Sequence, residues 1–103
     1  MELQYQKLEK EIRLIKLIGK LDIDGVKAVE SNSLLHCAGN QVKVIVDLSA
    51  LEILEAIGIE LLIWAAREVW SRGGRIAIIN PVSTVEQVLD RNGIKNGLRS
   101  TQV

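Results

Sequence analysis

The segment Val42–Leu48 is the sequence feature that most constrains the fold of this chain. It is short and rich in β-branched residues. Apart from its first positions, apolar side chains occupy both of its faces. This pattern is typical of a strand buried on both sides, as in the parallel sheets of α/β proteins. Arg75–Ile79 is a second short run of the same kind, so we expect an α/β fold with parallel strands at its centre.

Helical periodicity separates and follows these strands. From about Asp24 to Gly39-Asn40, small or apolar residues recur at helical spacing and predict a first helix. A second helix is expected to begin at Gly58 and to end at Arg72-Gly73-Gly74. A third is predicted from the capping-box spacing Ser83-Thr84-Val85-Glu86 to about Arg91. The first stripe comprises Val26, Val29, Ser33 and Cys37, with Leu34 at its edge; the second comprises Ile59, Leu62, Ile63, Ala66 and Trp70.

Two further strands are expected before the first helix. Leu3–Leu8 and Ile12–Ile18 form a hairpin that turns at Glu9-Lys10. Apolar residues on both faces of Ile12–Ile18 suggest that this strand too is covered on both sides, and Gly19 is expected to end it.

The predicted order is β-β-α-β-α-β-α-β, with Leu98–Val103 as a last short strand after two Asn-Gly turns. Right-handed crossovers then give one domain over residues 1–103, a small mixed sheet with helices packed mainly on one face.

Composition narrows the function. The 103 residues carry 13 Lys+Arg and 13 Asp+Glu, so no basic excess is present to bind nucleic acid directly. The longest apolar runs are too short for membrane insertion, and the first residues lack the pattern of a signal peptide. The single cysteine, Cys37, suits a reducing compartment. We therefore expect a cytoplasmic protein.

No group of residues has the pattern of a catalytic or metal site. His36 and Cys37 are adjacent, and neighbouring helical positions point about 100° apart, which suits neither a metal nor a Cys-His nucleophile pair. Gly73-Gly74 lies at a helix end rather than in a phosphate-binding turn. Two carboxylate pairs, Asp22 with Asp24 and Glu52 with Glu55, lack a neighbouring histidine. The sequence predicts no enzyme activity, no cofactor and no metal.

The segment Val44–Ile59 resembles the central signature of STAS domains, the anti-sigma factor antagonist family. A strand ending in Asp47-Leu48-Ser49 leads to Glu55-Ala56-Ile57-Gly58, where the family has Asp-Ser-x-Gly at a helix start. Upstream, Gly19-Lys20-Leu21-Asp22 resembles the family's Gly-x-Leu-Asp element. Downstream, Gly73–Asn80 and Val88–Ile94 resemble its later strand and helix.

The resemblance implies a non-catalytic protein-interaction domain that regulates transcription by partner switching. Such a domain binds an anti-sigma factor, usually a serine kinase-like ATPase, and so frees the sigma factor. The kinase phosphorylates the serine at the start of the second helix, and that position is Ala56 here, which predicts a non-phosphorylatable form. Many members continue into a final helix beyond the position of Val103. We expect a weak homodimer to hide the surface that this helix would cover.

Six residues are predicted to bind the partner. The second helix carries two apolar residues opposite its core stripe, which suggest either an interaction surface or cover by a neighbouring element. Asp22 suits either partner binding or a helix cap, and Asp47 is expected to anchor its loop through backbone amides. The predicted partner-binding residues are Asp22, Glu55, Ala56, Gly58, Leu61 and Trp64.

Two alternative functions remain open from the sequence. STAS proteins of lipid-transport ABC systems suggest a regulatory subunit docked on an ATPase. The same strand-to-helix loop also suits a small-ligand or nucleotide-binding module.

Overall fold

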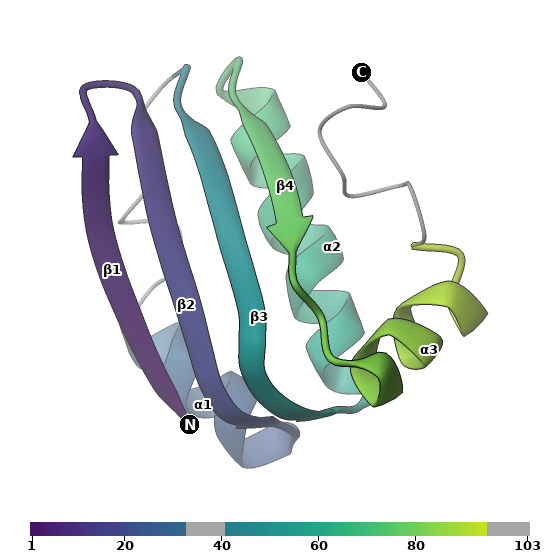
Figure 1. The fold of residues 1–103 in the computed structure, drawn as a ribbon. Helices are drawn as coiled ribbons and strands as arrows, with labels where there is room; N and C mark the ends of the chain where they lie inside the picture. The colour runs from purple at the N-terminus through teal and green to yellow at the C-terminus, as the bar shows by residue number, and fades with distance from the viewer. Residues whose placement is uncertain (33–40, 95–103) are drawn as a thin grey trace.

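The computed structural model describes residues 1–32 and 41–94, and within them four strands form one mixed sheet (Figure 1). The strands lie in the order β1-β2-β3-β4; β1 and β2 are antiparallel, whereas β3 is parallel to both β2 and β4. The elements are β1 Glu2–Glu9, β2 Ile12–Leu21, α1 Ile23–Asn32, β3 Lys43–Leu54, α2 Ala56–Ser71, β4 Arg75–Ile79 and α3 Ser83–Arg91. The predicted hairpin and the alternation after it are confirmed.

Some predicted features fall outside the described residues. These are the second half of the first helix, with Ser33, Leu34, His36, Cys37 and Gly39-Asn40, and the C-terminal features Asn96-Gly97 and Leu98–Val103.

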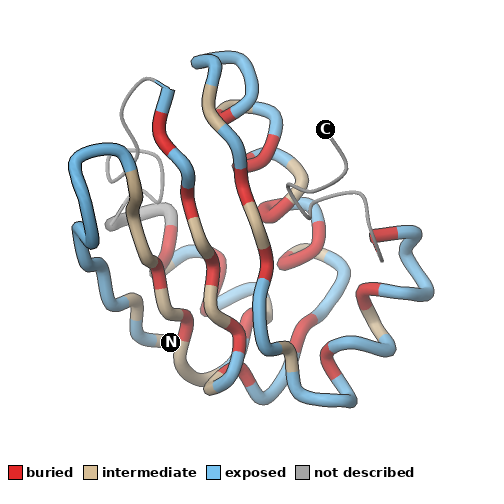
Figure 2. Tube along the Cα trace, turned by 45° about the horizontal axis from the view of Figure 1, so that its top comes forward, coloured by how far each residue is buried: buried red, intermediate tan, exposed pale blue. Residues whose placement is uncertain are grey.

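An aliphatic core lies between the sheet and its helices. Helices α1 and α2 lie behind the sheet, and α3 lies near the carboxyl end of β3 (Figure 1). Buried positions recur along the inner strands, as Figure 2 shows. The side chains that are almost fully buried include Ile15, Leu17, Val44, Val46, Leu62, Ile76, Val85 and Leu89. The prediction of helices mainly on one face is thus confirmed.

The opposite face of the sheet is open among the described residues. Ile12, Leu14 and Ile18 of β2 and Ile45 of β3 are only partly buried there. The prediction that Ile12–Ile18 is covered on both sides was therefore wrong. Apolar residues on both faces of a strand do not by themselves show that two layers cover it.

Strand β3 is longer than predicted because it contains two bulges. Between the register pairs Lys16↔Asp47 and Ile18↔Ala50, β2 advances by two residues and β3 by three. Between Gly19↔Leu51 and Lys20↔Ile53, β2 advances by one residue and β3 by two, so each bulge places one extra residue in β3. The predicted end of this strand at Leu48 and the predicted start of the second helix at Gly58 were wrong, since β3 continues to Leu54 and α2 begins at Ala56. Strand β2 likewise continues past Gly19 to Leu21.

The predicted glycine ending of α2 is present in the structure, whereas the predicted side-chain cap of α3 is not. Gly73 has φ +77°, its amide donates to Trp70 O (2.9 Å), and the amide of Gly74 donates to Val69 O (2.9 Å), which is a Schellman ending. The predicted stop of the second helix is confirmed. The capping box of the third helix was wrong, because Val82 occupies its N-cap and makes no side-chain cap.

Candidate partner-binding site

The carboxyl ends of β2 and β3 lie side by side and lead into α1 and α2. Leu21 is the register partner of Leu54, and the amide of Glu55 donates a hydrogen bond to Leu21 O (3.1 Å). Asp22 directly follows Leu21 in the chain. The starts of the two helices are more than thirty residues apart in sequence. A backbone hydrogen bond therefore holds them together at one edge of the sheet.

Asp22 is the N-cap of α1. Its Oδ1 accepts a hydrogen bond from the amide of Gly25 (2.9 Å), and its carbonyl accepts one from the amide of Val26 (2.8 Å). The capping role foreseen for this aspartate is confirmed. Gly25 lies so close to the carbonyl of Lys20 that a Cβ there would come within 2.1 Å of its oxygen, so only glycine fits.

The start of α2 depends on a second close approach. Glu55 is the N-cap with extended backbone, and its carbonyl accepts hydrogen bonds from the amides of Gly58 (2.9 Å) and Ile59 (3.1 Å). A Cβ on Gly58 would lie 2.7 Å from both Cγ and O of Leu21. Gly58 therefore lets the first turn of α2 pack directly on the end of β2. Ala56, the first helical residue, is exposed beside it.

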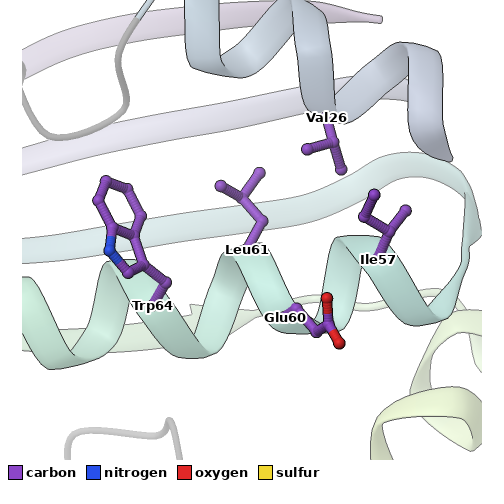
Figure 3. A pocket seen from close by; sticks show the side chains of 5 residues that line it. All are labelled: Val26, Ile57, Glu60, Leu61 and Trp64. Carbon is purple, nitrogen blue, oxygen red and sulfur yellow. The ribbon is translucent and has the colours of Figure 1, made fainter.

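A groove runs between α1 and α2, next to these helix starts. It encloses about 470 Å³. In Figure 3 the side chains of Ile57, Leu61 and Trp64 extend from α2 towards α1, where Val26 points back at them, and the carboxylate of Glu60 lies to one side. The five lining residues are Val26, Ile57, Glu60, Leu61 and Trp64. Helix α2 supplies four of them.

The structure separates the two apolar residues predicted on the outer side of this helix. Trp64 is 50% exposed, as expected for a surface position. Leu61 is only 7% exposed and belongs to the core, so of the two alternatives drawn from the sequence, cover by a neighbouring element holds for this residue. The reason is that α2 packs against α1 as well as the sheet, which widens its buried arc to include Leu61 and Ala65. Trp70, predicted in the core stripe, is 38% exposed.

The surroundings of the helix starts are acidic. Residues 20–28 and 52–60 together hold five carboxylates and two lysines, in a chain whose net charge is zero. The carboxylates are Asp22, Asp24, Glu52, Glu55 and Glu60. In the described part of the chain, no group of three or more His, Cys, Asp or Glu side chains could hold a metal ion. The local field favours a cationic ligand.

Asp47 lies away from this edge of the sheet and has a local role. Its Oδ1 accepts a hydrogen bond from the amide of Ser49 (2.9 Å), so the predicted backbone anchor is confirmed, although it lies within β3 rather than in a loop. Ser49 is an exposed residue of β3.

Comparison with known proteins agrees with this architecture. The family model of the STAS domain matches residues 6–101. This chain belongs to the STAS domain family. None of the helices in the described residues is long and apolar enough to cross a membrane.

Several of the proteins that this chain resembles are anti-sigma factor antagonists. An anti-sigma F factor antagonist of Lysinibacillus sphaericus is 26% identical over 95 residues, covering 91% of this chain and 81% of the relative. The unphosphorylated form of the anti-sigma factor antagonist SpoIIAA superposes with a TM-score of 0.70 at 23% identity, over 91% of this chain and 83% of that one. The phosphorylated form of SpoIIAA from Bacillus gives a TM-score of 0.66 at 25% identity, over 90% and 85%. The chain is thus an anti-sigma factor antagonist-like STAS domain.

Sequence reasoning missed three of the groove residues. Val26 was assigned to the core alone, and Ile57 and Glu60 received no role. The signal that was available is the spacing of Ile57, Leu61 and Trp64 at i, i+4 and i+7, which places them on one face of a helix.

Proposed function

We propose that this STAS domain is a non-catalytic antagonist that binds an anti-sigma factor, a serine kinase-like ATPase, and thereby releases a sigma factor. The observation that carries the proposal is the convergence of Asp22, Glu55 and Ala56 at one exposed edge of the sheet, fixed by the hydrogen bond from Glu55 N to Leu21 O. The anti-sigma factor antagonists among its relatives support the choice of partner.

The absence of a hydroxyl at Ala56 means that phosphorylation at this position does not regulate the domain. This residue lies at the first position of α2, where the positive end of a helix stabilises a phosphate. Neither Ala56 nor Ile57 offers an oxygen to phosphorylate. We expect the domain to bind its partner as a permanently unphosphorylated antagonist.

A nucleotide-binding function is less consistent with the site. Glu55 and Glu60 are exposed at the helix start and the groove, and together with Asp22 they would repel a polyphosphate. The same carboxylates suit a basic protein surface.

The test is direct binding to purified anti-sigma factors encoded in the same genome, measured by calorimetry with and without ATP. We expect one of them to bind, and added antagonist to release the sigma factor from that complex. Glu55→Lys should weaken the complex at least tenfold, whereas Glu2→Lys on the distant β1 should leave it unchanged. If no anti-sigma factor binds, the proposed function is wrong.

A further inference from the structure

We infer that the groove between α1 and α2 receives a short amphipathic helix of the partner, and that an arginine of this helix lies over Trp64 and pairs with Glu60. The inference deepens the proposed function, since the anti-sigma factor is the protein expected to supply the helix. Its structural basis, however, is the shape and charge of the groove itself.

The length of the groove limits its occupant. Ile57, Leu61 and Trp64 lie on successive turns of α2, and seven residues of an α-helix span about 10 Å. Val26 forms the opposite wall from α1. Two turns of a partner helix have the same length, and side chains at i, i+3 or i+4 and i+7 on it would enter the groove together. The groove has a volume of about 470 Å³, within the range of about 300–1,000 Å³ that is typical of ligand-binding pockets.

The apolar part of the groove has an exposed aromatic anchor. Leu61 is buried at the floor, whereas half of the Trp64 surface is open to solvent. Tryptophan is one of the residue types enriched among those that contribute most to binding when a partner covers them. Trp70, on the same helix and also partly exposed, does not line the groove.

Charge selects a cation as the polar part of the ligand. Glu60 precedes Trp64 by four residues on α2, and both side chains line the groove, with the carboxylate of Glu60 at its side (Figure 3). The carboxylate of Glu60 is exposed and makes no hydrogen bond or ion pair with any other described residue. A guanidinium group can stack on the indole face and form a two-pronged pair with this carboxylate, whereas an ammonium group is a compact point charge. The excess of carboxylates around the helix starts adds to the same preference.

Synthetic peptides test the groove without requiring the natural partner. The probe is a capped 14-residue helical peptide, about four turns long, with leucines at i, i+4 and i+7 and an arginine beside that stripe. Its control carries glutamine in place of arginine. With Trp70→Phe as the background, Trp64 is the single tryptophan, and its fluorescence reports binding at the groove. We expect the arginine peptide to bind at least fivefold more tightly than the glutamine peptide.

Variants of the protein separate the two contacts. Glu60→Gln should remove the preference for arginine, and Trp64→Ala, followed by calorimetry, should weaken binding of the arginine peptide at least tenfold. Glu2→Gln removes a carboxylate from β1 and should change neither value. Equal binding of both peptides, or no binding of either at millimolar concentration, would overturn the inference.

The natural partner then distinguishes this inference from the proposed function. If an anti-sigma factor binds the domain and Trp64→Ala and Glu60→Gln leave its affinity unchanged, the groove inference is wrong and the proposed function stands. If the peptides bind with the expected preference but no anti-sigma factor binds, the proposed function is wrong and the groove inference stands.

Discussion

The backbone amide of Glu55 donates a hydrogen bond of 3.1 Å to the carbonyl of Leu21, and this bond brings the starts of α1 and α2 together. Leu21 is the last residue of β2. The next residue, Asp22, caps α1 with its side chain, whereas Glu55 occupies the N-cap position of α2 without a side-chain cap hydrogen bond. The site is therefore built from backbone at the carboxyl ends of two parallel strands. The geometry of the site therefore depends on close packing between the start of α2 and the end of β2.

Gly58→Ala should destabilise the fold by about 1–3 kcal/mol, because its Cβ would overlap Leu21. The added methyl group would lie 2.7 Å from Leu21 O and 2.9 Å from Leu54 Cδ1, and backbone cannot move aside cheaply. Urea denaturation measures the change. Glu60→Ala, at an exposed position of the same helix, should stay within about 0.5 kcal/mol. Equal stabilities for the two variants would show that α2 does not press on β2 as described.

Removing the carboxylate of Asp22 should cost about 1 kcal/mol of folding free energy. Asp22→Ala leaves the amide of Gly25 without its 2.9 Å acceptor, while Asp22→Asn retains an oxygen at that place. Thermal or urea unfolding of both variants provides the measurement. A loss as large for asparagine as for alanine would mean that charge, not capping, is what this residue contributes.

The positions of Leu61 and Trp64 predict stability losses of different size. Leu61→Ala should destabilise the domain by about 2–5 kcal/mol because it opens a cavity in the core. Trp64→Ala removes a side chain that is half exposed, so it should cost less, about 1–2 kcal/mol. Denaturant unfolding of the two variants decides the matter. If the larger loss falls on Trp64, that side chain belongs to the core instead.

The burial of Leu61 also shows what sequence alone could not provide. A helical stripe predicted the side of α2 that faces the sheet, and Ile59, Leu62 and Ala66 are indeed buried. The side that faces α1 depends on where α1 packs, and this is set by tertiary contacts rather than by local periodicity. Leu61 was therefore placed outside.

Strand β3 illustrates a second limit. Val44, Val46 and Leu48 alternate and were read as a strand, whereas its continuation through Leu51 and Leu54 was not. Each bulge shifts the buried side from every second to every third residue, so strict alternation stops at the point where the bulges begin. Short elements without bulges, such as β4 over Arg75–Ile79, were predicted with their observed bounds.

The open face of the sheet bears on self-association. Leu14 and Ile45 are register partners on this face, and both remain partly exposed to solvent. We predict a weak homodimer, visible as a concentration-dependent sedimentation coefficient, that Leu14→Lys weakens about tenfold or more. Unfolding of this variant must be measured alongside, so that lost association is not confused with lost folding. A strictly monomeric native protein at high concentration would contradict the prediction.

The last prediction concerns Ala56 and tests whether this domain is no longer regulated by phosphorylation. Its exposed position at the start of α2 makes the backbone accessible to a kinase, but the methyl side chain has no oxygen to accept phosphate. We therefore expect the intact mass of the native protein to remain unchanged after incubation with ATP and the serine kinase-like anti-sigma factor. Ala56→Ser should gain the mass of one phosphate under the same conditions, because a hydroxyl there would lie at the positive end of the helix. The phosphorylated variant should then bind the anti-sigma factor at least tenfold more weakly than the native domain, since the new charge adjoins Glu55.

Ser49 provides the internal check, since it is exposed on β3 and is an alternative hydroxyl of the same region. A phosphate that appears on the native chain and disappears in Ser49→Ala would show that control has moved to Ser49 rather than been lost.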